Sequence, residues 1–413
     1  MNRRALIAML ALPGILGCDA TEPTATTAAG TAPASVGAEA ITRIDLGTLG
    51  GANAWAADIN NAGTVVGRSD TPQGSTLGFR WSLKGGMVPL PPLPGHHWSR
   101  ADQITPAGTI FGVSDTTGGS GQRVIWNAQG VPSRLNVPYP AGTTYGWIAV
   151  INDLRQAAGG AGSSDLSANG FFWSRQTGVL DFLQRTPGYY EVFPADLTSY
   201  GVVIGSYVDC MVGCWYRPFS WSLLTGFVSL GQPPEADPYG HFGVTAMNEL
   251  GEYVGWGDAP LSGGLYSYSW GPIHGFKILP PLDPTAEELA SGSAIDLFGR
   301  VVGQVLLEMQ DVSRPVVWPV SGGVVDLAPT DPSSAFAVAI NDKGIAVGST
   351  LTASGYHATA WKLPAGLQAS PSPQPRSLQG STRTGTSRLA ACFDRKVAAG
   401  GRIAFIECIS QTR

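Results

Sequence analysis

Residues 56–67 read AADINNAGTVVG and are followed, after a variable loop, by Phe79-Arg80-Trp81. The same order of residue types returns near the other end, where residues 337–348 read AVAINDKGIAVG. Five further copies lie between them, and the tryptophans that close the aromatic motif are Trp81, Trp126, Trp173, Trp221, Trp270, Trp318 and Trp361. Their spacings of 45, 47, 48, 49, 48 and 43 residues indicate one repeated β-unit.

Each copy predicts four strands. The first ends at Ile59-Asn60, and Asn-x-x-Gly forms a tight turn because Asn caps it and Gly accepts positive φ. The second strand is the Val-Val-Gly run, the third holds Phe79 and Trp81 on one side, and the fourth is Met87 to Leu90. Residues that recur in every copy are expected to serve packing and turn geometry. The prediction is an all-β, seven-bladed β-propeller of four-stranded blades.

The two ends of the repeat region predict how the ring closes. The seventh copy stops at Trp361-Lys362-Leu363 without a fourth strand, whereas Ile44 to Leu49 precede the first copy and belong to none. This segment is similar to the fourth strands of other copies, such as Val325-Asp326-Leu327. An unclosed ring would leave unpaired strand edges, so the N-terminal strand is expected to complete the last blade.

The combination of LGTLGG (Leu46 to Gly51), Asp58-Ile59-Asn60, Val65-Val66-Gly67 and Phe79-Arg80-Trp81 resembles the HAF repeats of bacterial extracellular proteins. The resemblance covers about residues 44–363. It implies an exported repeat protein, and it supplies no catalytic residues.

The N-terminus indicates export. Arg3 and Arg4 precede a short apolar run, which predicts a signal peptide over residues 1–17. Cys18, directly after Gly17, resembles the lipidated cysteine of a bacterial lipobox. The alternative is an ordinary signal peptide with a chance cysteine. Lipidation would attach the chain to a membrane at the bacterial cell envelope, in the periplasm or on the cell surface.

The remaining boundaries follow from composition. Residues 18–42 are expected to form a flexible tether, 43–363 the propeller, 364–387 a linker, and 388–413 a small β-hairpin. Four cysteines remain in the exported chain, and their proximity in sequence favours the disulfides Cys210–Cys214 and Cys392–Cys408. A metal site at Cys210 and Cys214 is the alternative, but no second ligand pair has suitable spacing.

The net charge and the absence of known motifs restrict the classes of ligand that this protein could bind. Removing residues 1–17 leaves 23 Lys and Arg against 30 Asp and Glu, a net charge of −7, which argues against nucleic acid. Phosphate loops, HExxH and GxSxG are absent from the sequence, so neither a cofactor nor catalytic residues are predicted. His96 and His97 are adjacent and point apart on a strand, so no metal site is predicted. A monomer is expected.

Two sets of residues are candidates for ligand binding. Asp58 and Asp196, in opposed blades, precede the ends of first strands and could line the central channel, although a hydrated channel wall is the simpler interpretation. The second set lies in long loops expected on one face: Trp98, Tyr145, Trp147, Tyr189, Tyr190, Trp215, Tyr239 and His241. Tyr and Trp offer large contact areas with a polar group, which suits a glycan, peptide or protein partner, or packing over the blade tops.

Three functions remain open. The favoured one is a non-enzymatic binding module at the cell envelope. The second is a propeller enzyme, a lyase or hydrolase acting on polysaccharide, which requires convergent carboxylates with His or Arg. The third is a purely structural envelope protein.

Overall fold

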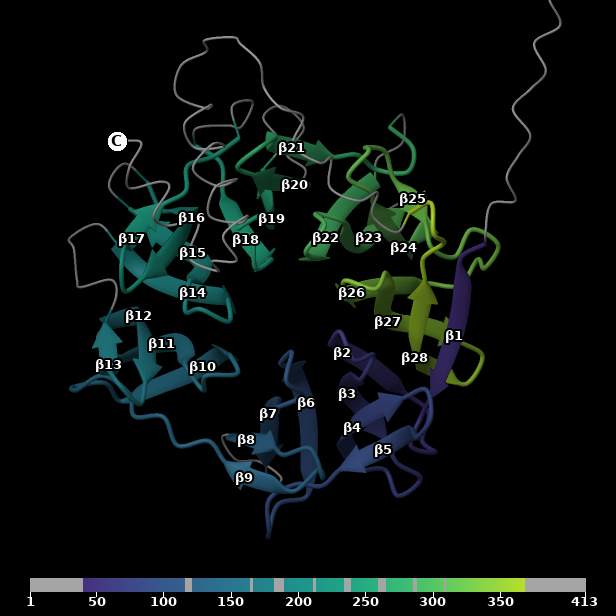
Figure 1. Ribbon diagram of the computed structural model, residues 1–413, viewed down its shortest axis with the longest axis horizontal. Helices are drawn as coiled ribbons and strands as arrows, with labels where there is room; N and C mark the ends of the chain where they lie inside the picture. The colour runs from purple at the N-terminus through teal and green to yellow at the C-terminus, as the bar shows by residue number, and fades with distance from the viewer. Residues whose placement is uncertain are drawn as a thin grey trace, which may run out of the picture. The chain divides into compact units, whose positions relative to one another are not determined.

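The computed structural model describes residues 40–115, 121–163, 166–181, 189–210, 213–233, 239–258, 265–284, 288–307 and 310–367. These residues form seven four-stranded antiparallel sheets arranged around one axis, a seven-bladed β-propeller as predicted (Figure 1). In every blade the strands are hydrogen-bonded in sequence order from the innermost outward, except in the last blade.

The strand bounds of the first four blades are as follows. Blade 1 holds β2 (Ala54–Ile59), β3 (Val65–Asp70), β4 (Thr76–Ser82) and β5 (Gly86–Leu90). Blade 2 holds β6 (Trp98–Ile104), β7 (Ile110–Asp115), β8 (Gln122–Trp126) and β9 (Pro132–Arg134). Blade 3 holds β10 (Tyr145–Ile151), β11 (Ala157–Ser163), β12 (Leu166–Ser174) and β13 (Gly178–Asp181). Blade 4 holds β14 (Tyr189–Leu197), β15 (Val203–Asp209), β16 (Trp215–Ser222) and β17 (Gly226–Ser229).

The other three blades follow the same plan. Blade 5 holds β18 (Phe242–Met247), β19 (Tyr253–Asp258), β20 (Leu265–Gly271) and β21 (Gly275–Leu279). Blade 6 holds β22 (Glu288–Ile295), β23 (Val301–Leu307), β24 (Val312–Trp318) and β25 (Val325–Asp326). Blade 7 holds β26 (Ala335–Ile340), β27 (Ile345–Thr352), β28 (Gly355–Lys362) and the N-terminal strand β1 (Thr42–Gly47).

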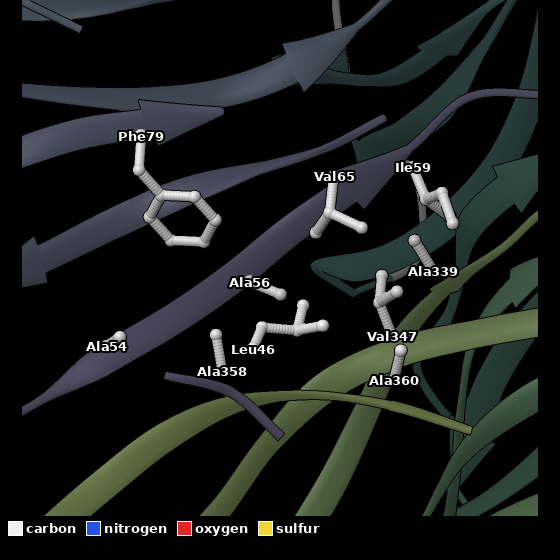
Figure 2. Packing of buried hydrophobic residues seen from close by; sticks show 10 residues of the cluster. All are labelled: Leu46, Ala54, Ala56, Ile59, Val65, Phe79, Ala339, Val347, Ala358 and Ala360. Carbon is white, nitrogen blue, oxygen red and sulfur yellow. The ribbon is translucent and has the colours of Figure 1, made fainter. Parts of the chain in front are cut away.

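The N-terminal strand closes the ring. β1 pairs antiparallel with β28, so that Ile44 lies opposite Ala360 and Asp45 opposite Thr359, which confirms the predicted closure. The side chain of Leu46 is buried in an apolar cluster between blades 7 and 1, together with Phe79 (Figure 2). Each blade buries its apolar face only against its neighbours, so this cluster seals the seam between the two ends of the repeat region.

The Asn-x-x-Gly turn both caps itself and joins blades. Asn341 Oδ1 accepts the backbone N–H of Ile345 at 3.0 Å, as predicted for a turn cap. Its Nδ2 donates to the carbonyl of Asn60 in blade 1 at 3.1 Å, a contact the sequence did not predict. Asn152 and Asn248 reach the next blade's turn in the same way, at 2.9 and 2.8 Å.

The glycine of Val-Val-Gly is required by a β-bulge. The register of the innermost strand shifts near its end in every blade, between Ala56 and Asp58 in blade 1, and blade 4 has a second shift earlier in the strand. The bulge brings the carbonyl of Trp55 so close that a Cβ on Gly67 would lie 2.0 Å from its oxygen. Equivalent glycines meet the same carbonyl in the other six blades, at 1.8–2.3 Å. Only glycine therefore fits this position.

Candidate functional site

The propeller has two unlike faces. Tight turns join first to second and third to fourth strands on one face, here called the turn face. The loops between second and third strands meet the connections between blades on the other, here called the loop face. The predicted candidates Trp98, Tyr145, Tyr189 and Tyr190 begin β6, β10 and β14, and these three strands start at the loop face.

One repeat position forms a ring on the loop face. Four residues before the Ile, Leu or Met that ends each innermost strand, the chain places Trp55, Arg100, Trp147, Phe193, Gly243, Ser291 and Phe336. We call these seven residues the rim, because equivalent positions of seven blades surround the central axis. Blades 7, 1, 2, 3 and 4 are consecutive, and each contributes a large, flat and partly buried side chain. The rim is therefore an arc of aromatic rings interrupted by one guanidinium.

The rim of blades 3 and 4 continues into an aromatic cluster. The ring centroids of Trp147 and Phe193 are 6.3 Å apart, and those of Phe193 and Tyr216 are 5.9 Å apart. Tyr216 contacts Trp256 of blade 5 at 6.1 Å. Trp147 lies over Gly160, where a Cβ would come within 2.3 Å of its indole, so glycine makes room for the ring. Aromatic pairs at these separations stabilise one another.

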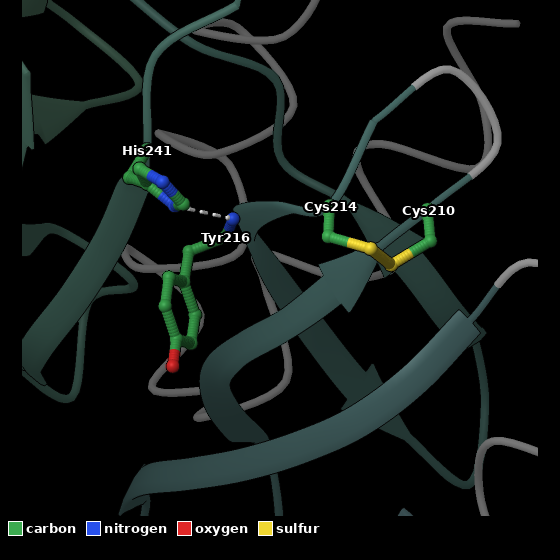
Figure 3. The surroundings of a disulfide bond; sticks show 4 residues. All are labelled: Cys210, Cys214, Tyr216 and His241. Atoms are coloured by element: carbon green, nitrogen blue, oxygen red, sulfur yellow. Dashed lines mark hydrogen bonds between the residues drawn. A yellow bond between two sulfur atoms is a disulfide. The ribbon is translucent and has the colours of Figure 1, made fainter.

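A disulfide holds the outer part of this cluster. Cys210 and Cys214 are bonded at the tip of the β15–β16 hairpin, which confirms the predicted pairing (Figure 3). The next residue, Trp215, contacts His241 at 5.3 Å and Tyr239 at 6.5 Å between ring centroids. Tyr239 is 63% exposed. The structure thus brings together three of the predicted loop residues, Trp215, Tyr239 and His241, and joins them to Trp147 through Tyr216.

His241 is oriented by two hydrogen bonds. The backbone N–H of Tyr216 donates to Nδ1 of His241 at 3.2 Å, so the ring nitrogen Nδ1 acts as acceptor and a neutral ring carries its proton on Nε2 (Figure 3). The backbone N–H of His241 donates to Oδ2 of Asp258 at 2.8 Å. These contacts fix the imidazole edge against the aromatic cluster.

The rim of blades 7, 1 and 2 lies beside arginine side chains. Phe336 contacts Tyr356 at 6.0 Å, Tyr356 contacts Trp55 at 6.3 Å, and the guanidinium of Arg68 lies 4.6 Å from the centroid of Trp55. In blade 2, the Arg100 guanidinium contacts the Asp102 carboxylate at 2.8 Å.

Asp102 lies between two guanidiniums, because Arg123 reaches its other oxygen at 3.3 Å. Burial raises the pKa of Asp102, and the positive charges of Arg100, Arg123 and Arg68 oppose that rise. This sector therefore holds three cations around one carboxyl group.

The two predicted channel aspartates join blades. Asp58 accepts backbone N–H groups from Ile59 at 2.7 Å and from Ile104 of blade 2 at 2.8 Å. Asp196 makes the equivalent bonds to Leu197 and to Met247 of blade 5, at 2.7 and 2.9 Å.

Both carboxyl groups have displaced pKa values. Burial raises the pKa of Asp58 to about 7 and that of Asp196 to about 6, while the backbone hydrogen bonds act in the opposite direction. The carboxyl oxygens of both residues thus accept hydrogen bonds from the protein's own backbone. These bonds connect each blade to the next one.

Of the seven rim residues, only Trp147 is among the candidates predicted from the sequence. The signal of the rim was available in the repeat alignment, where this position holds W, R, W, F, G, S and F, five of them large and planar. Cys18, Cys392 and Cys408 lie outside the described residues, as do the expected signal peptide, most of the tether and linker, and the C-terminal hairpin.

Other features of the described part lie away from the rim. Two hollows open on the turn face, one beside Glu252 and His274 and one beside Asn127 and Arg155. Among the described residues, no group of three or more His, Cys, Asp or Glu side chains is arranged to hold a metal ion. The same part of the chain has no helix that is long and apolar enough to span a bilayer.

No family model and no curated protein matches this chain. Solved structures with the same fold include a prolyl endopeptidase at 11% identity and a TM-score of 0.51, over 76% of this chain and 50% of that one. The β-propeller domain of the Trilobed protease from Pyrococcus furiosus is 10% identical with a TM-score of 0.48, over 75% of this chain and 95% of that one. TolB from Acinetobacter baumannii is 14% identical with a TM-score of 0.39, over 73% and 80%. The chain spans about half the length of the matched prolyl endopeptidase, and at these identities the likeness shows the fold alone.

Proposed function

We propose that this protein is a non-enzymatic binding scaffold of the bacterial cell envelope, and that the rim and its aromatic cluster bind a polysaccharide. The observation that carries the proposal is the arc of partly buried flat side chains on five consecutive blades. Buried rings would serve the core, and isolated exposed rings would be incidental, whereas an ordered arc offers successive stacking surfaces to a chain of sugar rings.

The position of the chain ends supports this proposal. Thr42 lies opposite Lys362, at the end of β28 that reaches the turn face. The segment before β1 therefore joins the domain on the turn face, opposite the rim. A lipid on Cys18 would attach the domain through that segment, at the face opposite the rim.

The test of ligand binding is a glycan array probed with the full chain carrying Cys18→Ala, followed by titration of the best polysaccharide. Trp147→Ala and Phe193→Ala are each expected to weaken binding about tenfold, because a stacking surface is lost. Phe298→Ala is the matched control, since this ring is 43% exposed on the turn face. Absence of any bound glycan, or an equal loss in the control, would contradict the proposal.

The same titration addresses the enzyme alternative. Asp58 and Asp196 have raised pKa values, but their carboxyl oxygens accept hydrogen bonds from backbone N–H groups of their own blade and of the next blade. A bound oligosaccharide is expected to keep its chain length during prolonged incubation. Shortened products would instead identify a lyase or hydrolase.

Lipidation has a separate test. Mass spectrometry of the mature N-terminus is expected to find lipid on Cys18, and Cys18→Ala is expected to abolish lipid labelling. Labelling that persists in this variant would refute lipidation at Cys18 and would leave the proposal of ligand binding at the rim unchanged.

A further inference from the structure

We infer that the sector of the rim between blades 1 and 2 binds a carboxylate group, so that the polysaccharide taken by this protein is acidic, of the uronate type. This inference deepens the proposed function and rests on it. It is carried by Arg68 and Arg100, whose guanidiniums have N–H donors without a hydrogen-bond partner among the described residues.

Arg68 is exposed and carries an unused set of donors. Its guanidinium lies over Trp55, and within the described part of the chain it makes no hydrogen bond or ion pair. A ring face holds a guanidinium in place without occupying its N–H groups, so its five donors remain available to a ligand.

Arg100 is held by one edge only. Its Nε contacts Oδ1 of Asp102 at 2.8 Å, and its side chain is 41% exposed. The terminal nitrogens have no hydrogen-bond partner among the residues that the structure describes. Asp102 thus orients the guanidinium from one side and leaves the outer pair of N–H groups free, the arrangement that suits a bidentate carboxylate.

The two arginines lie near the same carboxyl group, because Arg100 contacts Asp102 and the positive charge of Arg68 also acts on it. Arg68 pairs across the strands with Gly78, and a Cβ on Gly78 would lie 3.1–3.4 Å from the backbone of Arg100 and Ala101. Because cross-strand partners point to the same side of a sheet, Arg68 is directed towards blade 2, against the backbone of β6 at Arg100.

The local charge favours an anion. Arg68, Arg100 and Arg123 surround a single carboxyl group, Asp102, in a chain whose net charge is −5. The sector therefore carries a positive excess beside the ring of Trp55. A uronate residue combines the two features needed here, a sugar ring for stacking and a carboxylate for the guanidiniums.

The test compares an oligogalacturonate with its methyl ester, which keeps the sugar rings and removes the charges. Isothermal titration of the full chain carrying Cys18→Ala is expected to show at least tenfold tighter binding of the acid, with a preference that falls as salt rises. Arg68→Gln and Arg100→Gln are each expected to reduce the affinity for the acid about tenfold and to leave the ester unchanged. Arg134→Gln removes the same charge from the outer strand of blade 2 and is expected to change neither.

The outcomes separate this inference from the proposed function. Equal binding of acid and ester, or a preference that survives both substitutions, overturns the carboxylate site while sugar binding stands. Trp147→Ala should weaken both ligands equally. A polyglutamate peptide is the third ligand. If it alone binds, both the acidic-sugar inference and the polysaccharide proposal fail. If none of the three ligands binds, the uronate inference is overturned.

Discussion

The turn face and the rim are built from the same seven repeats, but the fold restricts the residue types at their positions to different degrees. On the turn face the residue after the innermost strand is Asn60, Thr105, Asn152, Thr198, Asn248, Asp296 or Asn341, and all seven are buried. On the rim the side chain varies from indole to hydrogen, and the large ones are partly exposed. A position that must satisfy its own turn allows few residue types, whereas a position that faces solvent allows many. Recurrence therefore marks structure here, and large, partly exposed side chains at a varied position mark the candidate site.

The largest expected effect concerns the seam that both faces depend on. Deleting Thr42–Gly47 removes β1 and exposes the edge of β28 together with the apolar cluster around Leu46. The expected result is loss of cooperative thermal unfolding, with aggregation in size-exclusion chromatography. Deleting residues 19–38 is the control and should change neither. Cooperative unfolding at the original temperature without β1 would show that the ring does not need this closure.

The next effect is a pH dependence that belongs to the joints between blades and not to the rim. Asp58 and Asp196 have folded pKa values of about 7 and about 6, above the value of 3.8 for a free Asp, so the folded state retains their protons more strongly than the unfolded state. Their contribution is complete below about pH 4, and the free energy of unfolding falls as pH rises from about 4 to 7, by up to about 4 kcal/mol for Asp58.

Denaturant titrations across this pH range test the assignment. The double variant Asp58→Asn and Asp196→Asn should lose most of the slope, and Asp311→Asn, at an exposed position, should keep it. An unchanged slope in the double variant would assign the pH dependence elsewhere.

A smaller effect is expected from a single turn residue. Asn341→Ala removes two cap bonds and the bond to the Asn60 carbonyl, and it leaves buried groups unpaired, so we expect a loss of about 2–3 kcal/mol of unfolding free energy. Asn127 caps a turn of blade 2 with the same geometry but is exposed. Asn127→Ala should cost about 1 kcal/mol or less in chemical denaturation. Equal losses would mean that the contact between blades adds nothing.

The smallest effect is expected at Arg68, which lies over the rim residue Trp55. Arg68→Gln removes a guanidinium from the face of Trp55 and should lower the free energy of unfolding by less than about 1 kcal/mol. Thermal unfolding of the Arg68→Gln and Asn341→Ala variants under the same conditions compares the two losses directly. A loss as large as that of Asn341→Ala would make Arg68 a structural residue and would weaken the functional interpretation of the rim.

Much of the site could not be read from the sequence for a definite physical reason. Trp215 and His241 are 26 positions apart, and their contact depends on how blade 4 packs on blade 5. Asp58 and Asp196 were recognised as unusual, but their partners Ile104 and Met247 belong to the following blade. Contacts across a blade junction depend on the twist between two sheets, which local patterns do not encode.

The sequence by itself determined the number of blades, the four strands of each, the turn caps and the strand that closes the ring. These features depend on local periodicity and on turn chemistry, which act over a few residues. Only the tertiary structure decided that the glycine of Val-Val-Gly must lack a Cβ because the carbonyl of a bulged strand lies against it. It also decided that Asn341 forms a hydrogen bond to blade 1, and that one variable position of the repeat forms a rim around the axis. Those properties arise when seven sheets pack around a common axis and bring equivalent positions, about 45 residues apart in the chain, next to one another.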